Sequence, residues 1–333
     1  MIEKLLNDPI SIGLNLSNAN LTGVNLAGAN LGRANLSGTV FVGAYLRDAN
    51  LMDANLNGAQ FRSAVLKGAY LRGADLSEAG LSEADLDGAN LWNAKLIDAV
   101  LTSANLIGTI LTGADLTRAH LSNSDMSQAH LRGANLTDAN LAGANLSGAN
   151  LAGANLADAN LEGANLSGAN LSGANLADAY LSGANLSGTN LAGANLADAN
   201  LEGANLSGAN LAGANLADAD LCNADLRGVY LSKAALTDSM LDEANLTDAN
   251  LADANLKGAT MTYVNLTRAC LKGANLTDVD LTEGDLSGST LDGANLVGAN
   301  LSGANLGGVN LGRVDLHLVE LMGAIMPDGS IHK

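Results

Sequence analysis

The sequence predicts an all-β solenoid whose chain turns a corner every five residues, and three observations support this. A Leu, Phe or Met stands at every fifth position from Leu16 to Met326 without a change of phase. The residue two positions earlier is small, in most repeats Ala, and Leu14 is the one large exception. Gly is common two positions after the Leu, as at Gly23 and Gly28.

This period fits neither of the two regular secondary structures. On an α-helix, five residues advance the chain by about 140° net, so successive leucines would spread around the axis without forming an apolar stripe. In a flat strand, an odd period places alternate leucines on opposite faces. A chain that turns a corner every five residues can instead bury the whole set.

Each five-residue segment is therefore expected to point its Leu and its preceding small residue inward. The other three positions face solvent. The Gly after each Leu suits the corner, because glycine adopts positive φ without strain. Asn precedes Leu in most repeats, and we expect these side chains to stack and hydrogen-bond along a column.

Written as Ala-Asn/Asp-Leu-x-x, the tandem repeat resembles the pentapeptide-repeat proteins, and "ANLSGANLAGANLADANLEG" at 144–163 is a clear example. The resemblance implies a right-handed quadrilateral β-helix with about 20 residues per coil and about sixteen coils. At about 4.8 Å per coil, the solenoid would be about 75 Å long. The C-terminal "GAIMPDGSIH" resembles the endings of cyanobacterial members of this family. Some of those relatives are implicated in the regulation of cell differentiation or in transport.

The sequence predicts one continuous repeat domain over 14–326, flanked by an N-terminal cap at 1–13 and a C-terminal cap or tail at 327–333. Both flanking segments leave the pattern, and each contains a proline. Caps are expected because the open ends of a solenoid expose unpaired backbone groups.

A cytoplasmic location is expected from three features. The N-terminal segment carries Glu3, Asp8 and Pro9 and lacks the apolar run of a secretory signal. No stretch approaches the roughly 18 apolar residues of a membrane span. Cys222 and Cys270 fall on different sides of a 20-residue coil, so they are expected to remain unpaired, as in a reducing compartment.

The charge distribution argues against direct nucleic acid binding. The chain has a net charge of −18, and no Lys, Arg or His occurs from Gly133 to Leu226. Phosphate contacts need a basic surface. Aromatic residues, which stack on single-stranded bases, make up only 2% of the chain.

The sharpest surface feature is a set of aspartates that recur every 20 residues, which we call the aspartate column. Two interpretations remain open: a solvated face copied by duplication, or a docking surface for a basic protein. Repulsion between neighbours is only about 1 kcal/mol in water, so the column is tolerable without a ligand. Calcium is not expected, because a straight column supplies too few oxygens per ion. Its members are Asp138, Asp158, Asp178, Asp198, Asp218 and Asp238, and the same acidic segment contains Glu162 and Glu202.

Trp92 and Tyr70 form a second candidate site, because both are predicted to point outward on one side of the solenoid. They are either incidental surface aromatics or anchors for a protein partner. At the C-terminal end, Leu318, Met322 and Ile325 are also predicted to point outward. They either pack the cap or form an end-to-end homodimer.

Neither a catalytic site, a metal site nor a cofactor site is expected. His120 and His130 are half a coil apart, so they cannot share a metal. Serine is abundant but has no neighbouring histidine to act as a base. The glycines never form a phosphate-binding loop followed by Lys-Ser or Lys-Thr.

The sequence thus predicts a non-catalytic scaffold, a rigid acidic solenoid that presents flat sides to a protein partner. The alternative is a DNA mimic that binds DNA gyrase or topoisomerase and protects it from inhibitors, as some members of the resembled family do. The acidic segment carries one charge per roughly 2.5 Å, less than the one per about 1.7 Å of duplex DNA. The C-terminal helical module and projecting loops of the gyrase-binding members are also absent from the sequence. A third interpretation is an exported structural protein of a lumen or periplasm.

Overall fold

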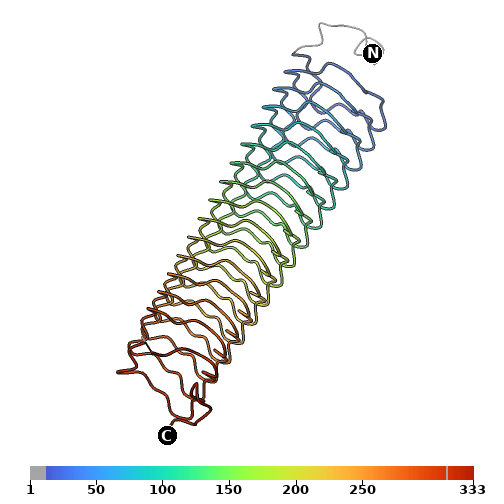
Figure 1. The fold of residues 1–333 in the computed structure, drawn as a ribbon. Coiled ribbons are helices and arrows are strands. Elements are labelled where there is room, and N and C mark those ends of the chain that lie inside the picture. The colour runs from blue at the N-terminus through green and yellow to red at the C-terminus, as the bar shows by residue number, and fades with distance from the viewer. Residues whose placement is uncertain (1–12, 313) are drawn as a thin grey trace. The chain divides into compact units, whose positions relative to one another are not determined.

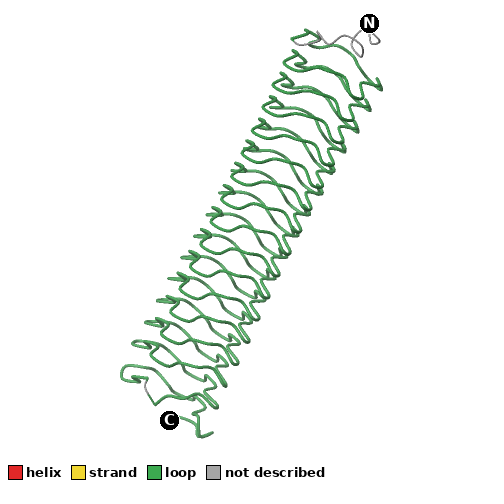
Figure 2. Ribbon diagram, turned by 45° about the horizontal axis from the view of Figure 1, so that its top comes forward, coloured by secondary structure: helices red, strands yellow, loops and turns green. Residues whose placement is uncertain are grey.

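The structure is a computed structural model that describes residues 13–312 and 314–333 (Figure 1). The chain divides into two compact units, Met1–Asn170 and Leu171–Lys333. We describe each unit by itself. The described residues contain neither an α-helix nor a continuous β-strand, and Figure 2 accordingly shows their trace as loop. The predicted continuity of the repeat domain over 14–326 stays a prediction.

Within each unit, the chain pairs with itself at intervals of 20 residues. Single-residue parallel bridges run from Asn15↔Asn35 to Asn150↔Asn170 in the first unit. In the second unit, they run from Asn175↔Asn195 to Asn305↔Ile325. A 20-residue offset holds four five-residue segments, so each coil has four sides. This offset agrees with the coil length expected from the repeat.

Each side is joined to the next coil by backbone hydrogen bonds, and each corner closes on itself. The Leu26 N–H donates to the Tyr45 carbonyl at 2.7 Å, and the Asn50 N–H donates to the Ala29 carbonyl at 2.9 Å. At the corner, the Ala29 N–H donates to the Leu26 carbonyl at 3.0 Å. Gly28 lies between them with φ of 66°, which is typical of the third residue of a type II turn.

The core is the predicted column of Leu and small residues. In the first unit, Leu26 and Ala29 are 0% and 1% exposed, and Leu196 and Ala199 of the second unit are equally buried. Larger apolar residues occupy the same slots, and the rings of Phe41 and Phe61 stack in parallel, 4.7 Å apart. The predicted inward register is therefore confirmed.

The asparagines before each Leu form the predicted hydrogen-bonded columns. The Asn50 Nδ2 donates to the Asn30 Oδ1 at 2.9 Å, and in the second unit the Asn215 Nδ2 donates to the Asn195 Oδ1 at 2.8 Å. The same oxygen also accepts the backbone N–H two residues later, as from Ala197 to Asn195 at 3.4 Å. Asparagine thus stabilises both the stack and the corner.

The predicted N-terminal cap at 1–13 lies outside the described residues except for Gly13, whose N–H donates to the Gly32 carbonyl at 3.2 Å. The C-terminal segment folds back, with an antiparallel bridge between Ile325 and Ile331. The His332 N–H donates to the Ala324 carbonyl at 2.8 Å. The role of 327–333 as a cap stays a prediction.

Candidate functional site

The aspartate column lies on the corners of the coils, and this position has a local cause. In the second unit, the N–H groups of Asp178 and Asp198 donate to the next coil at 3.0 Å. All six members are exposed. Each has φ of 56–58°, a left-handed conformation that Asp and Asn tolerate better than other non-glycine residues. The recurrence of Asp at these corners therefore has a structural explanation.

The aspartate column has different charged neighbours in the two units. In the first unit, Arg118 makes a bidentate ion pair with Asp98: its Nε donates to Oδ1 at 2.8 Å and its Nη2 donates to Oδ2 at 2.7 Å. The hydrogen bond from Arg118 holds the pKa of Asp98 below its usual range. The same hydrogen bond is the main cause that raises the pKa of Arg118, and the charge of Asp138 makes a smaller contribution. Among the described residues of the second unit, the ion pairs are Arg227–Asp225 and Arg268–Asp248, which belong to a different side from the column.

Glu162 and Glu202 lie away from the aspartate column. Both are exposed, and their N–H groups donate to the side chains of Asn160 and Asn200 at 2.9 and 3.0 Å. Asn200 belongs to a bridge column that starts at Tyr180, whereas the aspartates follow the column that starts at Asn175. The structure thus does not bring these two groups of acids together on one side.

A stronger acidic surface lies on the second unit, and the sequence analysis did not single it out. The bridge column from Tyr180 to Glu320 defines one side, which we call the acidic face. Within the second unit this side has no Lys or Arg between Tyr180 and Gly323. Sorting the charges by their place in a 20-residue period would have found it. Its acidic residues are Glu202, Asp220, Asp242, Glu243, Asp280, Glu283 and Glu320.

Hydrogen bonds fix several of these carboxylates. Asp242 accepts hydrogen bonds from the Thr260 hydroxyl and from the N–H and hydroxyl of Thr262, at 2.6–2.8 Å. Asp220 accepts the N–H of Cys222 at 3.0 Å. Burial is the main cause that raises the pKa of the Cys222 thiol to about 11. This thiol therefore stays protonated and is a poor nucleophile.

The aromatic candidates lie together on the first unit, as predicted. Tyr70 is 51% exposed and Trp92 is 36% exposed. Tyr70 bridges Asn90, which places both aromatics on one side in successive coils. The guanidinium carbon of Arg72 lies 4.0 Å from the centroid of the Trp92 ring, a cation–π contact. The sequence analysis missed Arg72, although it stands 20 residues before Trp92.

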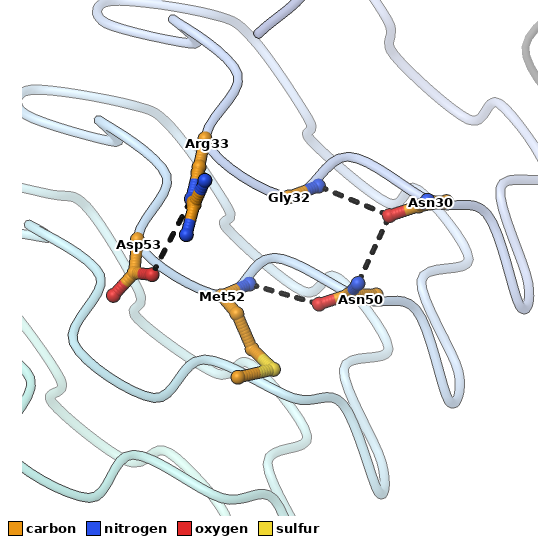
Figure 3. Close-up of a pocket in the computed structure, with 6 residues that line it drawn as sticks. All are labelled: Asn30, Gly32, Arg33, Asn50, Met52 and Asp53. Atoms are coloured by element: carbon orange, nitrogen blue, oxygen red, sulfur yellow. Dashed lines mark hydrogen bonds and ion pairs between the residues drawn. The ribbon is translucent and has the colours of Figure 1, made fainter. Parts of the chain in front are cut away.

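A shallow cavity of about 260 Å³ lies on the same side of the first unit (Figure 3). Its polar groups bond to one another: the Gly32 N–H donates to Asn30 at 3.4 Å, and the Met52 N–H donates to Asn50 at 3.1 Å. An ion pair of 3.8 Å joins Arg33 to an aspartate. The lining has no Ser, Cys, Lys or His, and its one carboxylate, Asp53, is the ion-pair partner of Arg33. Its lining residues are Asn30, Gly32, Arg33, Asn50, Met52 and Asp53.

Other candidate chemistry is not assembled in the described part of the chain. His120 and His130 belong to separate bridge columns. Within residues 13–312 and 314–333, no group of three or more His, Cys, Asp or Glu could hold a metal ion. Cys222 and Cys270 are both free and half-buried.

The described residues include no helix of the length and apolarity that crossing a membrane requires.

The C-terminal side chains are exposed as predicted. Leu318 is 66%, Met322 76% and Ile325 40% exposed. Asn310 and Asp315 lack the bridge to the preceding coil that the corresponding residues of earlier coils make. This end of the second unit therefore presents apolar side chains, while dimerisation through it stays a prediction.

Several solved structures resemble the chain. A pentapeptide repeat protein, Rfr23 from the cyanobacterium Cyanothece 51142, is 38% identical with a TM-score of 0.26. That match covers 26% of this chain and 58% of Rfr23, so the chain spans little more than half of that protein's length. HetL from the cyanobacterium Nostoc sp. strain PCC 7120, a pentapeptide repeat protein involved in heterocyst differentiation regulation, is 29% identical. That match covers 96% of this chain and 92% of HetL, with a TM-score of 0.17.

A third solved structure is QnrB1, a plasmid-mediated fluoroquinolone resistance protein. It is 21% identical, and the match covers 50% of this chain and 82% of QnrB1 with a TM-score of 0.35. All three TM-scores are below 0.5, so these superpositions carry no argument about function. No curated protein matches the chain.

The family model for pentapeptide repeats matches the chain in eight copies, and these matches extend from residue 15 to residue 313. The matched segments are 15–53, 54–93, 94–133, 134–173, 174–211, 204–241, 239–278 and 274–313. They include the Leu, small-residue and Asn columns that form the core and the corners. The chain therefore belongs to the pentapeptide repeat family.

Proposed function

We propose that this chain is a non-catalytic scaffold that binds a protein partner through its charged sides. The observation that carries the proposal is the fixed spacing of exposed charges. Each coil is held by backbone hydrogen bonds of about 2.7–3.0 Å to the next coil. Exposed side chains on one side are therefore held in register. A surface ordered in this way loses little conformational entropy on binding.

Within this proposal, the aspartate column is the docking surface for a basic partner. Asp178, Asp198, Asp218 and Asp238 are exposed at the same corner of consecutive coils of the second unit. Neighbouring members stand one coil apart, at about 4.8 Å. A row of carboxylates at this spacing attracts lysines and arginines of a partner and fixes their register.

The test compares two variants with the same change in net charge. The first replaces these four aspartates by Asn, which keeps the left-handed corner because Asn tolerates that conformation as well as Asp does. The matched control replaces four acids elsewhere in the second unit by their amides: Asp220, Glu243, Glu283 and Glu320. Partners captured from a cyanobacterial lysate are identified by mass spectrometry, purified and titrated against all three proteins.

We expect the column variant to lose the partner and the control to retain it. Equal weakening by both variants would contradict docking at the column and would point to a general effect of net charge. Retention by both would leave the column as a solvated face. Folding of each variant is checked by its circular dichroism spectrum and thermal midpoint.

The alternative function is DNA mimicry toward DNA gyrase, and the cation-free acidic face of the second unit favours it. The test is direct: purified protein is added to a gyrase supercoiling assay with and without a fluoroquinolone. The acids of the matched control, Asp220, Glu243, Glu283 and Glu320, lie on this face. Protection by the natural protein that is lost in that control would establish this alternative in place of the scaffold. Unchanged supercoiling and unchanged drug sensitivity would eliminate it.

The proposal takes the right-handed, four-sided β-helix of the family, with about sixteen coils, as the form of the scaffold. It places the chain in the cytoplasm, which the two free cysteines support. An end-to-end homodimer through Leu318, Met322 and Ile325 stays a separate prediction, independent of the scaffold, and is the competing explanation for any self-association. Sedimentation of a Met322→Lys variant tests this last point.

A further inference from the structure

One side of the first unit differs in charge from the rest of this acidic protein. The bridge column from Asn30 to Asn150 defines this side, which we call the basic–aromatic face. Its charged side chains are three arginines and one aspartate, although the chain as a whole carries a net charge of −18. Beyond Asp53, this side of the unit has no carboxylate. The residues that characterise the face are Arg33, Asp53, Tyr70, Arg72, Trp92, Ile110, His130 and Arg132.

Two of the arginines have no carboxylate partner within the described residues. Arg33 pairs with Asp53 at 3.8 Å, whereas Arg72 and Arg132 form no ion pair there. Arg72 lies over the ring of Trp92. This stacking uses the flat face of the guanidinium and leaves its N–H edge free for a carboxylate from outside the chain.

Exposed aromatic and apolar side chains lie beside Arg72 and in the two coils that follow it toward Arg132. Tyr70, Trp92 and Ile110 are 51%, 36% and 36% exposed, and they occupy successive coils because Tyr70 bridges Asn90 and Asn90 bridges Ile110. Exposed aromatic and Arg side chains are typical of protein interface centres. From Arg33 to Arg132 the face is about 24 Å long at about 4.8 Å per coil. This length is comparable with the edge of a standard patch of about 800 Å² per partner.

The acidic face of the second unit complements this side in charge and in spacing. Arg72 and Arg132 stand three coils apart, and Asp220 and Asp280 are also three coils apart along the acidic face. Met240, which is 41% exposed, lies between the two aspartates. Both faces repeat with the same coil spacing. If the two arginines of one face pair with the two aspartates of the other, the side chains between them are therefore brought opposite one another.

We propose that the basic–aromatic face of one copy docks against the acidic face of a second copy of this chain. Arg72 and Arg132 bind Asp220 and Asp280, and the apolar side chains between them meet across the interface. In this contact one copy uses its basic–aromatic face and the other uses its acidic face, so the pair leaves one face of each kind open. The inference does not depend on partner docking at the aspartate column.

The test uses charge reversal on each face. The basic-face variant carries Arg72→Glu and Arg132→Glu, and the acidic-face variant carries Asp220→Arg and Asp280→Arg. A control reverses two cations on another side of the first unit, Arg47→Glu and Lys67→Glu. Its change in net charge equals that of the basic-face variant. Molar mass is measured by sedimentation and light scattering over a concentration series, at salt of about 50 mM and about 500 mM.

We expect the natural protein and the control to self-associate at low salt and to dissociate at high salt. In the basic-face variant, the dissociation constant should rise at least about tenfold. Neither face variant should associate with itself, because each then presents like charges at the paired positions of the two faces. When the two are mixed, the intact acidic face of one meets the intact basic face of the other, so a complex that contains both variants should form.

A natural protein that stays monomeric at low salt would overturn the proposal. A mixture of the two variants that remains monomeric would also overturn it, provided that both variants keep the natural circular dichroism spectrum. Association that survives both reversals and is lost in Met322→Lys would assign self-association to the C-terminal end instead.

Discussion

Replacing Leu121 by Ala tests the physical basis of the fold. Leu121 is fully buried in the first unit, and so are Leu101 and Leu141, its counterparts in the adjacent coils. The substitution removes three carbons from the core, which costs about 2.4 kcal/mol of transfer free energy at about 0.8 kcal/mol per buried methylene. A cavity term adds to this loss.

The cavity term should be large because the backbone cannot collapse into the space. The Leu121 N–H donates to the Asn140 carbonyl at 2.7 Å, and the Leu101 N–H donates to the His120 carbonyl at 2.7 Å. These bonds fix the spacing of the three coils. We therefore expect a total loss of about 3–5 kcal/mol in the free energy of unfolding, the upper part of the range for buried Leu→Ala changes.

The control is Leu121→Met, which conserves volume and should cost less than about 1.5 kcal/mol. The chain itself has a methionine in an equivalent slot, Met126, which is fully buried. Urea unfolding gives the size of the effect, and amide hydrogen exchange gives its location. Because each coil contacts only its neighbours, protection should fall mainly around residues 101–141. A loss below about 1 kcal/mol, or equal losses for Ala and Met, would refute a tightly packed and rigid core.

Three further predictions concern single side chains. The Ser289 hydroxyl is buried without a hydrogen-bond partner in the structure, so Ser289→Ala should leave thermal stability unchanged or raise it. The control is Ser124→Ala, which removes a 2.7 Å hydrogen bond to a backbone carbonyl. This change should lower the free energy of unfolding by about 1 kcal/mol. In a Cys270→Ser variant, alkylation of Cys222 should stay slow at pH 8–9 and accelerate toward pH 11, because the pKa of its thiol is raised to about 11. An alkylation rate at pH 8 like that of free cysteine would contradict this. The hydrogen bond from Arg227 lowers the pKa of Asp225, so its contribution to stability is present above the carboxyl's ordinary pKa and is lost as pH falls below it. Acid titration of the thermal midpoint should therefore be shallower for Asp225→Asn, and curves of equal slope would show that the pair contributes nothing.

Much of the fold could be predicted because every coil repeats the same local rules. The Leu period predicted the buried column, and the Gly positions predicted the positive-φ corners. The pattern also extends to corners without glycine, since Asp138 adopts φ of 58°. The second role of Asn, in accepting the N–H two residues later, was not predicted. It depends on corner geometry that the period alone does not specify.

The candidate site could be predicted only in part, because lateral neighbours depend on the coil register. The sequence analysis grouped the aspartates that recur every 20 residues, since an identical spacing is visible in the sequence. It did not group Asp220, Asp242 and Glu243, which lie on one side at different places within their repeats. It found Trp92 but not Arg72, whose contact with the ring crosses from one coil to the next.

The sequence by itself determined the five-residue period, the inward column and the corners, because each of these depends only on neighbours within one repeat. The tertiary structure decided which surface side chains meet. A five-residue pattern is compatible with coils of more than one length, and bridges between residues 20 apart select four segments per coil. That register stacks Arg72 on Trp92 and gathers the acidic face of the second unit. Charges far apart along the chain become neighbours only once the backbone hydrogen bonds between successive coils have set the closure of each turn.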